Sequence, residues 1–259
     1  MKQISSSANP RYRALRKLVQ SSQERRKTGL SVLDGVHLAA AYRGHVGLPR
    51  TIAVSRSALA NPEVAELLQN TKGVEILALG DALFATLSSV ATPTGILAVV
   101  ETPRPQPAPR DLDACVMLED LQDPGNVGSI LRSCAASGVR HVLLSRGSVH
   151  AWSPRVLRAG MGAHFALAIH EEVDLVAAAR EFAGSRVATQ PAAPRNLFDA
   201  DLKGPVALMF GNEGSGLSAS LLEAADCVVS IPMPGRAESL NVAAAAAVCL
   251  FERVRQLRQ

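Results

Sequence analysis

The chain has 259 residues, of which 47% are hydrophobic and 3% aromatic, and its net charge is +4. No apolar run reaches the roughly eighteen residues of a membrane span, and the polar, basic N-terminus lacks the apolar core of a secretory signal. The sequence therefore predicts neither a membrane span nor a secretory signal. It predicts an α/β protein, which we expect in the cytoplasm.

The first 30 residues are strongly basic. They hold eight Lys and Arg side chains against Glu24 alone, so this segment carries +7 and the remaining chain −3. Because clustered positive charge attracts polyanions, the segment is a candidate RNA contact. The alternative is a solvated helix behind an unstructured leader. The candidate RNA-binding residues are Arg11, Arg13, Arg16, Lys17, Arg25, Arg26 and Lys27.

The next part of the chain alternates apolar runs with helix-like stretches. The predicted strands lie near 31–33, 51–54, 74–77 and 95–100, and the predicted helices at 35–43 and 62–69. This alternation predicts a small α/β domain over residues 1–102. Four prolines follow in residues 103–112, where they remove amide donors and favour extended backbone, so we predict a linker between two domains.

The C-terminal part, residues 113–259, contains six further strand candidates, mostly separated by helical stretches. They are 115–118, 141–144, 165–169, 186–189, 206–210 and 227–231. Such alternation predicts a largely parallel sheet covered on both faces, with a ligand site at the carboxyl ends of the strands. The Ala-rich residues 240–258 predict a long final helix.

The four cysteines, Cys115, Cys134, Cys227 and Cys249, show no paired spacing, and two of them begin apolar strand-like runs. This favours buried free thiols over a disulfide framework. We expect no metal site.

The first of three polar loops spans residues 118–139. Asp123-Pro124-Gly125 predicts a turn, and Asn126 can begin the helix that follows. Arg132 would project from the second turn of this helix and could hold an RNA phosphate through two hydrogen bonds. The alternative is an ordinary surface helix with an Asn cap.

The second loop, residues 207–218, runs from an apolar strand into three glycines with Glu213 at the tip. Glycine lets the backbone approach a ligand closely, and successive free amides can hold polar groups. No Lys follows the last glycine and the G-x-G-x-x-G spacing is absent, which argues against an unrelated nucleotide-binding enzyme. The alternative is a sharp turn capped by Ser218.

The third loop, residues 230–248, is stiffened by Pro232 and Pro234, and Gly235 follows them before Ser239 and Asn241 open the final helix. A helix N-terminus offers unpaired amides to a carboxylate, such as that of an amino-acid-like cofactor. Simple helix capping is again the alternative.

Together, the segments DPGNVGSILRSCAASGV, FGNEGSGLS and IPMPGRAESLNVAAAAAV closely resemble the three ordered motifs of the SpoU–TrmH family of RNA ribose methyltransferases. Residues 155–169 resemble the family's connecting segment, with Gly160 where relatives often carry Ser. The N-terminal half is similar, more loosely, to a ribosomal-protein-like substrate-binding domain, through the Ser6-x-x-Asn9-Pro10 pattern and Asp34-Gly35.

The resemblance implies a C-terminal α/β domain with a deep trefoil knot, a homodimer and the cofactor S-adenosylmethionine. The residues that it places in the active site are Asn126, Arg132, Glu213, Ser239 and Asn241. Gly211, Ile231 and Leu240 match positions whose backbone holds the cofactor, and the further candidate cofactor residues are Thr189, Asn212 and Gly214. Arginine is effectively never deprotonated, so we expect Arg132 to clamp the ribose hydroxyl and a phosphate rather than act as a base.

The function that follows is methylation of a ribose 2′-hydroxyl in RNA, with 23S-type ribosomal RNA as the expected substrate and transfer RNA as the alternative. A second alternative is a non-catalytic RNA-binding factor of ribosome assembly. The presence of every polar residue that the motifs require favours the enzyme.

Overall fold

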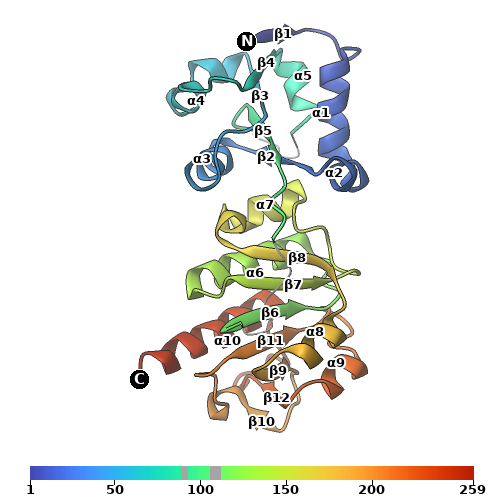
Figure 1. Cartoon of the computed structure of the whole chain (residues 1–259), viewed down its shortest axis with the longest axis vertical. Helices are drawn as coiled ribbons and strands as arrows, with labels where there is room; N and C mark the ends of the chain where they lie inside the picture. The colour runs from blue at the N-terminus through green and yellow to red at the C-terminus, as the bar shows by residue number, and fades with distance from the viewer. Residues whose placement is uncertain (89–92, 106–111) are drawn as a thin grey trace. The chain divides into compact units, whose positions relative to one another are not determined.

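The computed structural model describes residues 1–88, 93–105 and 112–259, and the chain forms two compact units (Figure 1). The first comprises Met1–Pro103 and Trp152–Phe165, and the second comprises Arg104–Ala151 and Ala166–Gln259. Most of the predicted linker, residues 106–111, lies outside the described residues.

The first unit contains a five-stranded mixed sheet. Its strands are β1 (Lys2–Ile4), β2 (Leu30–Asp34), β3 (Thr51–Ser55), β4 (Glu75–Leu79) and β5 (Ile96–Glu101). Its helices before β5 are α1 (Pro10–Gln20), α2 (Ser22–Thr28), α3 (Val36–His45), α4 (Pro62–Leu68) and α5 (Asp81–Ala85), with a 3₁₀ turn η1 (Ser57–Ala60). The sheet order is β1-β4-β3-β5-β2, with β5 antiparallel to β2 and β3. The four predicted strands are confirmed, whereas β1 was not predicted.

Helix α1 is amphipathic and explains much of the N-terminal sequence. Tyr12, Leu15 and Leu18 recur every three residues and are buried against the sheet. Strand β1 precedes the helix and pairs with β4, so the leader is not unstructured. The Nζ atom of Lys2 and the Nε atom of Arg11 lie 2.7 and 2.8 Å from a carboxylate oxygen of Glu75. Five more of the seven candidate RNA-binding residues are exposed to solvent; they are Arg13, Arg16, Lys17, Arg26 and Lys27.

Arg25 corrects the predicted RNA contacts. Its side chain is only 5% exposed, and its Nη1 atom donates to the backbone oxygens of Leu18 (2.7 Å) and Val19 (3.1 Å). These carbonyls belong to the last turn of α1, where helix geometry leaves them without intrahelical partners. The charge of an arginine in the sequence does not show whether its side chain is a buried cross-link or a surface cation. Arg25 therefore holds α2 against α1 and is withdrawn from the predicted RNA contacts.

The segment Trp152–Phe165 joins the first unit although the predicted boundary placed it in the second domain. It contains α7 (Pro154–Gly160), and η2 (Ala163–Ala166) follows. The rings of Tyr42 and Phe165 meet edge to face with centroids 5.4 Å apart, which anchors the segment on α3. Positive φ angles at Met161 and Gly162 turn the chain before η2. The predicted strand 165–169 therefore begins later, at Ala168.

The second unit contains a seven-stranded sheet in which every observed pairing is parallel. Its strands are β6 (Ala114–Leu118), β7 (His141–Ser145), β8 (Ala168–Val173), β9 (Ser185–Thr189), β10 (Arg195–Asn196), β11 (Val206–Phe210) and β12 (Cys227–Ser230). The order is β10-β12-β9-β11-β6-β7-β8. The parallel sheet is thus confirmed, and the short edge strand β10 was not predicted.

Helices cover both faces of this sheet. They are α6 (Pro124–Ser137), α8 (Leu175–Glu181), α9 (Ala219–Glu223) and α10 (Val242–Leu257), with a 3₁₀ turn η3 (Leu197–Asp199). Figure 1 shows α6 and α10 together on one side of the sheet and α8 and α9 on the other. Consequently β6 and β11, in the middle, are buried along their whole length. No helix in the described part of the chain combines the length and the apolar character that crossing a membrane requires.

The cysteines are free. Cys115, Cys134 and Cys249 are buried, and burial raises the pKa of each thiol to about 12, so these thiols stay protonated. Cys227 is half-buried, so the prediction of buried thiols is confirmed for three of the four.

We predict that Arg25→Ala lowers the free energy of unfolding by about 2 kcal/mol, because it removes two charge-assisted hydrogen bonds and leaves carbonyls of α1 unpaired. Denaturant titration followed by circular dichroism measures the change. Lys27→Ala, on the exposed face of α2, is the matched control and should unfold like the wild type. Equal stability of the Arg25 variant and the wild type would contradict the cross-link.

Candidate functional site

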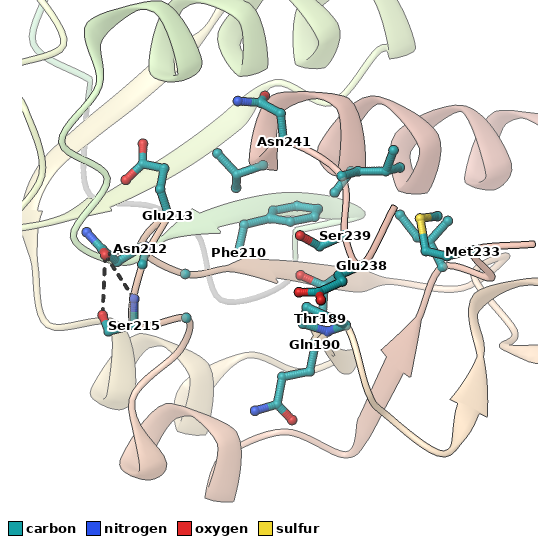
Figure 2. A pocket seen from close by; sticks show the side chains of 18 of the residues that line it. Thr189, Gln190, Phe210, Asn212, Glu213, Ser215, Met233, Glu238, Ser239 and Asn241 are labelled. Atoms are coloured by element: carbon teal, nitrogen blue, oxygen red, sulfur yellow. Dashed lines mark hydrogen bonds between the residues drawn. The ribbon is translucent and has the colours of Figure 1, made fainter. Parts of the chain in front are cut away.

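A cavity of about 590 Å³ opens at the carboxyl ends of β9, β11 and β12 (Figure 2). It is lined by the loop after β11, the loop before α10, and the end of β9. All six candidate cofactor residues line it, namely Thr189, Gly211, Asn212, Gly214, Ile231 and Leu240. Of the candidate catalytic residues, Glu213, Ser239 and Asn241 also line it. Two of the three polar loops that the sequence singled out, 207–218 and 230–248, therefore meet at this cavity, as expected for the carboxyl edge of a parallel sheet.

The loop after β11 is held in a tight bend by Asn212. Its side-chain Oδ1 accepts hydrogen bonds from the amides of Gly214 (2.9 Å) and Ser215 (3.2 Å) and from the hydroxyl of Ser215 (3.4 Å). Figure 2 draws dashed lines between Asn212 and Ser215. Its Nδ2 donates to the carbonyl of Asp120 at 2.7 Å, which ties the loop to the end of β6. Asn212 is thus a structural residue of the cavity wall as well as a lining residue.

Gly211 is needed for this bend. A Cβ atom at this position would lie 2.2 Å from the carbonyl carbon of Gly216 and 2.3 Å from the amide nitrogen of Leu217. Both are backbone atoms, so a side chain could fit only if the loop opened. The two strands of the bend pair through the amides and carbonyls of Asn212 and Gly216, at 2.9 and 3.1 Å.

A hydrogen-bonded relay joins the three loops. The Nδ2 atom of Asn241 donates to Oδ1 of Asn126 at 2.9 Å, and Nδ2 of Asn126 donates to Oε1 of Glu213 at 2.9 Å. Oδ1 of Asn241 accepts from the amide of Ala243 at 2.9 Å, which makes Asn241 the N-cap of α10. Asn126 does not line the cavity itself, but the relay places it next to two residues that do.

Glu213 accepts hydrogen bonds from three donors in the segment after β6. Besides Asn126, its carboxylate faces the amides of Gln122 (3.4 Å) and Asp123 (3.3 Å) at the start of α6. Burial acts to raise the pKa of Glu213, but these hydrogen bonds outweigh burial and hold the pKa below its ordinary value. A carboxylate with a lowered pKa is a weak base and is poorly suited to accept a proton. We therefore interpret Glu213 as a structural residue that holds the loop after β11 against the start of α6.

Helix α6 begins two residues earlier than predicted. Asp123 is its N-cap, with Oδ1 accepting from the amide of Asn126 at 2.8 Å, and Pro124 occupies the first helical position. Proline suits that position because its missing amide would have no intrahelical partner there. Asn126 therefore lies inside the first turn, where its side chain is available to the relay instead of capping the helix.

Arg132 is exposed on α6 and does not line the cavity. It lies six residues beyond Asn126, about 9 Å along the helix axis. Within residues 1–88, 93–105 and 112–259, no observed hydrogen bond or ion pair involves its guanidinium. The structure therefore leaves Arg132 free for a ligand outside this chain but does not bring it into contact with the relay.

A second set of contacts, not predicted from the sequence, fixes the loop after β6. Asp120 has a positive φ angle; its amide donates to Oγ of Ser145 at 2.8 Å, and that hydroxyl donates back to the Asp120 carboxylate at 2.6 Å. Glu119 accepts from the amide and the hydroxyl of Ser218, both at 2.7 Å. The sequence carried a signal for these contacts, because polar residues stand at the ends of strands that are neighbours in the parallel sheet.

The lining also contains residues that were not candidates from the sequence, among them Gln190, Met233 and Glu238. Gln190 and Glu238 are direct neighbours of the predicted Thr189 and Ser239, so proximity to a predicted residue could have identified them. Among the described residues, His, Cys, Asp and Glu form no group of three or more that could hold a metal ion.

Comparison with known proteins extends beyond the motifs. The SpoU rRNA Methylase family matches residues 113–251. An uncharacterised tRNA/rRNA methyltransferase of Synechocystis is 34% identical over 98% of this chain and 93% of its own length. The 23S rRNA (guanosine(2553)-2′-O)-methyltransferase of Bacillus subtilis is 30% identical over 97% of this chain and 98% of its own. The likeness therefore includes both units.

A solved structure agrees with these sequence matches. The SpoU methyltransferase AviRb from Streptomyces viridochromogenes, in complex with the cofactor AdoMet, superposes with a TM-score of 0.84 at 31% identity. The superposition covers 96% of this chain and 98% of that one. The α/β fold with its parallel sheet is therefore shared with a protein that binds S-adenosylmethionine.

We predict that Gly211→Ala weakens the binding of S-adenosylmethionine about tenfold or more, because the new Cβ forces the cavity wall open. Isothermal titration calorimetry measures the affinity. Gly204→Ala is the matched control, since its Cβ would meet no atom within 4 Å. An unchanged affinity in the Gly211 variant, with a native circular dichroism spectrum, would contradict the role of this bend.

Proposed function

The chain belongs to the SpoU rRNA methylase family, and on this basis we propose that it transfers a methyl group from S-adenosylmethionine to a ribose 2′-hydroxyl of ribosomal RNA. The observation that carries the proposal is the relay Asn241–Asn126–Glu213, which joins the three family motifs at the edge of one cavity. The full-length likeness to a 23S ribosomal RNA methyltransferase supports the substrate class, since it includes the N-terminal unit.

The cavity fits the cofactor in size and in chemistry. Its volume of about 590 Å³ lies within the roughly 300–1,000 Å³ of small-molecule sites. Val229, Ile231 and Leu240 supply apolar walls, while Gly211 keeps the backbone of the glycine-rich loop close to the cavity. Both charged lining residues are glutamates, which suits a cationic ligand. When bound, S-adenosylmethionine supplies an activated methyl group on a sulfonium with a good leaving group.

The side chains around the cavity divide the remaining work. We assign Gly211, Ile231 and Leu240, with Thr189, Asn212 and Gly214, to holding the cofactor. We assign Asn126 and Asn241 to orienting the ribose, because the relay fixes both amides. Glu213 braces the loops, and Ser239 completes the polar edge of the cavity beside Asn241. Positioning by such fixed groups is the main contribution that a methyl transfer requires of the protein.

Arg132 is assigned to the RNA. Its guanidinium carries a permanent charge and can hold a phosphate and the reacting hydroxyl at the same time. Positive charge beside a hydroxyl favours the deprotonated form, so Arg132 would help the ribose oxygen lose its proton to solvent without accepting it. Its exposure on α6, without a partner among the described residues, is compatible with this role.

The first unit is proposed to select the RNA. Arg13, Arg16 and Lys17 on α1 and Arg26 and Lys27 on α2 form an exposed basic surface. We call this set the α1–α2 basic surface. It is suited to phosphate contacts, which position an RNA without reading its sequence. In this arrangement the first unit, which includes Trp152–Phe165, binds RNA, residues 103–112 connect the domains, and the rest of 113–259 carries the reaction.

Membership of the family also supports three further proposals about the second unit and the whole protein. We propose that the loops of the second unit form a deep trefoil knot, that the protein is a homodimer, and that it acts in the cytoplasm without a metal ion. Light scattering on the purified protein tests the dimer.

We predict that purified wild-type protein transfers labelled methyl from S-adenosylmethionine to ribosomal RNA taken from cells that lack this gene. The labelled position should resist alkaline cleavage, since a methylated 2′-oxygen cannot attack the phosphate. The Arg132→Ala variant should bind the cofactor like the wild type. It should transfer the methyl group at least about a hundredfold more slowly. Scintillation counting of the RNA measures transfer, and calorimetry measures binding.

Arg140→Ala is the matched control, because this exposed arginine follows α6 at the opposite end of the sheet. Label found in transfer RNA alone would overturn the proposal that ribosomal RNA is the substrate. Cofactor binding without transfer to any RNA would favour the non-catalytic assembly factor. A fully active Arg132 variant would refute the role of that arginine.

We also predict that Arg13→Gln combined with Arg16→Gln reduces the salt dependence of RNA binding, because fewer counterions are released from the RNA. The slope of log affinity against log salt concentration should fall by about two, one for each phosphate that the variant no longer neutralises. Lys72→Gln combined with Lys203→Gln removes two exposed charges elsewhere and should leave the slope unchanged. Equal slopes for both double variants and the wild type would show that α1 does not contact RNA.

A further inference from the structure

The charged side chains that line the cavity are all negative. Its lining contains two carboxylates, Glu213 and Glu238, and no Lys, Arg or His side chain of the described residues. Figure 2 shows the two carboxylates on different loops, Glu213 beside Asn212 and Glu238 beside Ser239. A cavity with this lining carries two formal negative charges, so it attracts a cation and disfavours an anion.

The two carboxylates differ in what they already bind. Glu213 accepts from the side chain of Asn126 and faces two backbone amides, so its charge is largely compensated. Glu238 lies on an exposed loop, and no observed hydrogen bond or ion pair of the described residues involves it. Glu238 is therefore the charged group of the lining that remains available to a ligand.

The charge of the ligand changes during the proposed reaction. S-adenosylmethionine carries a positive sulfonium, and the product S-adenosylhomocysteine has a neutral thioether in its place. The α-ammonium and α-carboxylate groups are the same in both molecules. An available carboxylate in the cavity can therefore bind S-adenosylmethionine more tightly than S-adenosylhomocysteine through the sulfonium charge alone.

We propose that Glu238 is a cofactor-binding residue that makes the cavity prefer the sulfonium form of the cofactor over its thioether product. The inference rests on the proposed function, since it requires that the cavity hold S-adenosylmethionine. Its attraction acts on the cofactor before transfer and disappears once the methyl group has left. Glu238 thus promotes exchange of the spent product for fresh cofactor.

The test compares the affinities of the two cofactor forms by calorimetry, without RNA and without turnover. Wild-type protein should bind S-adenosylmethionine more tightly than S-adenosylhomocysteine. Glu238→Gln should weaken binding of the sulfonium form about five- to tenfold and leave binding of the thioether nearly unchanged, as expected for one partly screened charge pair. Glu238→Asp keeps the charge and should retain most of the preference.

Glu223→Gln is the matched control, because it removes the same charge from an exposed position on α9 that does not line the cavity. It should keep the wild-type ratio of the two affinities. Equal weakening of both ligands by Glu238→Gln would show that Glu238 contacts the shared ammonium, and unchanged affinities would show that it contacts neither; both outcomes overturn the inference alone. If the wild-type protein bound neither ligand, the proposed function would fail and the inference with it.

Discussion

The relay from Asn241 through Asn126 to Glu213 is the interaction on which the site depends. Its members lie in three different segments: Asn241 at the start of α10 after β12, Asn126 in the first turn of α6 after β6, and Glu213 in the loop after β11. One amide side chain in the middle, that of Asn126, uses its oxygen toward one loop and its nitrogen toward another. Because an amide has both a donor and an acceptor, no carboxylate or hydrocarbon of similar size could make both contacts. The relay is thus a geometric constraint that sets the spacing of the three loops.

The parallel sheet makes this relay possible. Strands that run in the same direction deliver all their carboxyl ends to one edge, so loops distant in the sequence become neighbours there. The contacts of Asp120 with Ser145 and of Glu119 with Ser218 reinforce the same edge. Burial of β6 and β11 on both faces holds the strand ends in register. The buried strands and the hydrogen bonds between the loops at their carboxyl ends therefore form a cavity whose walls consist of backbone as much as of side chains.

The two units use their charges in different ways. In the first unit, helix amphipathicity sends apolar residues such as Tyr12 and Leu15 inward and leaves arginines such as Arg13 and Arg16 in solvent. In the second unit, the charges of the cavity are carboxylates, one engaged and one available. A basic surface for a polyanion and an acidic cavity for a cation can coexist in one chain because they occupy separate units. This separation is consistent with an enzyme that binds an RNA and a positively charged cofactor.

The sequence by itself determined the elements and the motifs, because these depend on local periodicity and on residues that are close along the chain. Apolar runs located all four predicted strands of the first unit and five of the six predicted strands of the second, and Asn241 was correctly read as opening the last helix. Only the tertiary structure decided which of these residues meet. It made Arg25 a buried cross-link, moved Trp152–Phe165 into the first unit through a ring contact with Tyr42, and brought Glu238 into the cavity. The physical reason is that burial and long-range contact depend on how distant segments pack, and neither charge nor spacing along the chain encodes that directly.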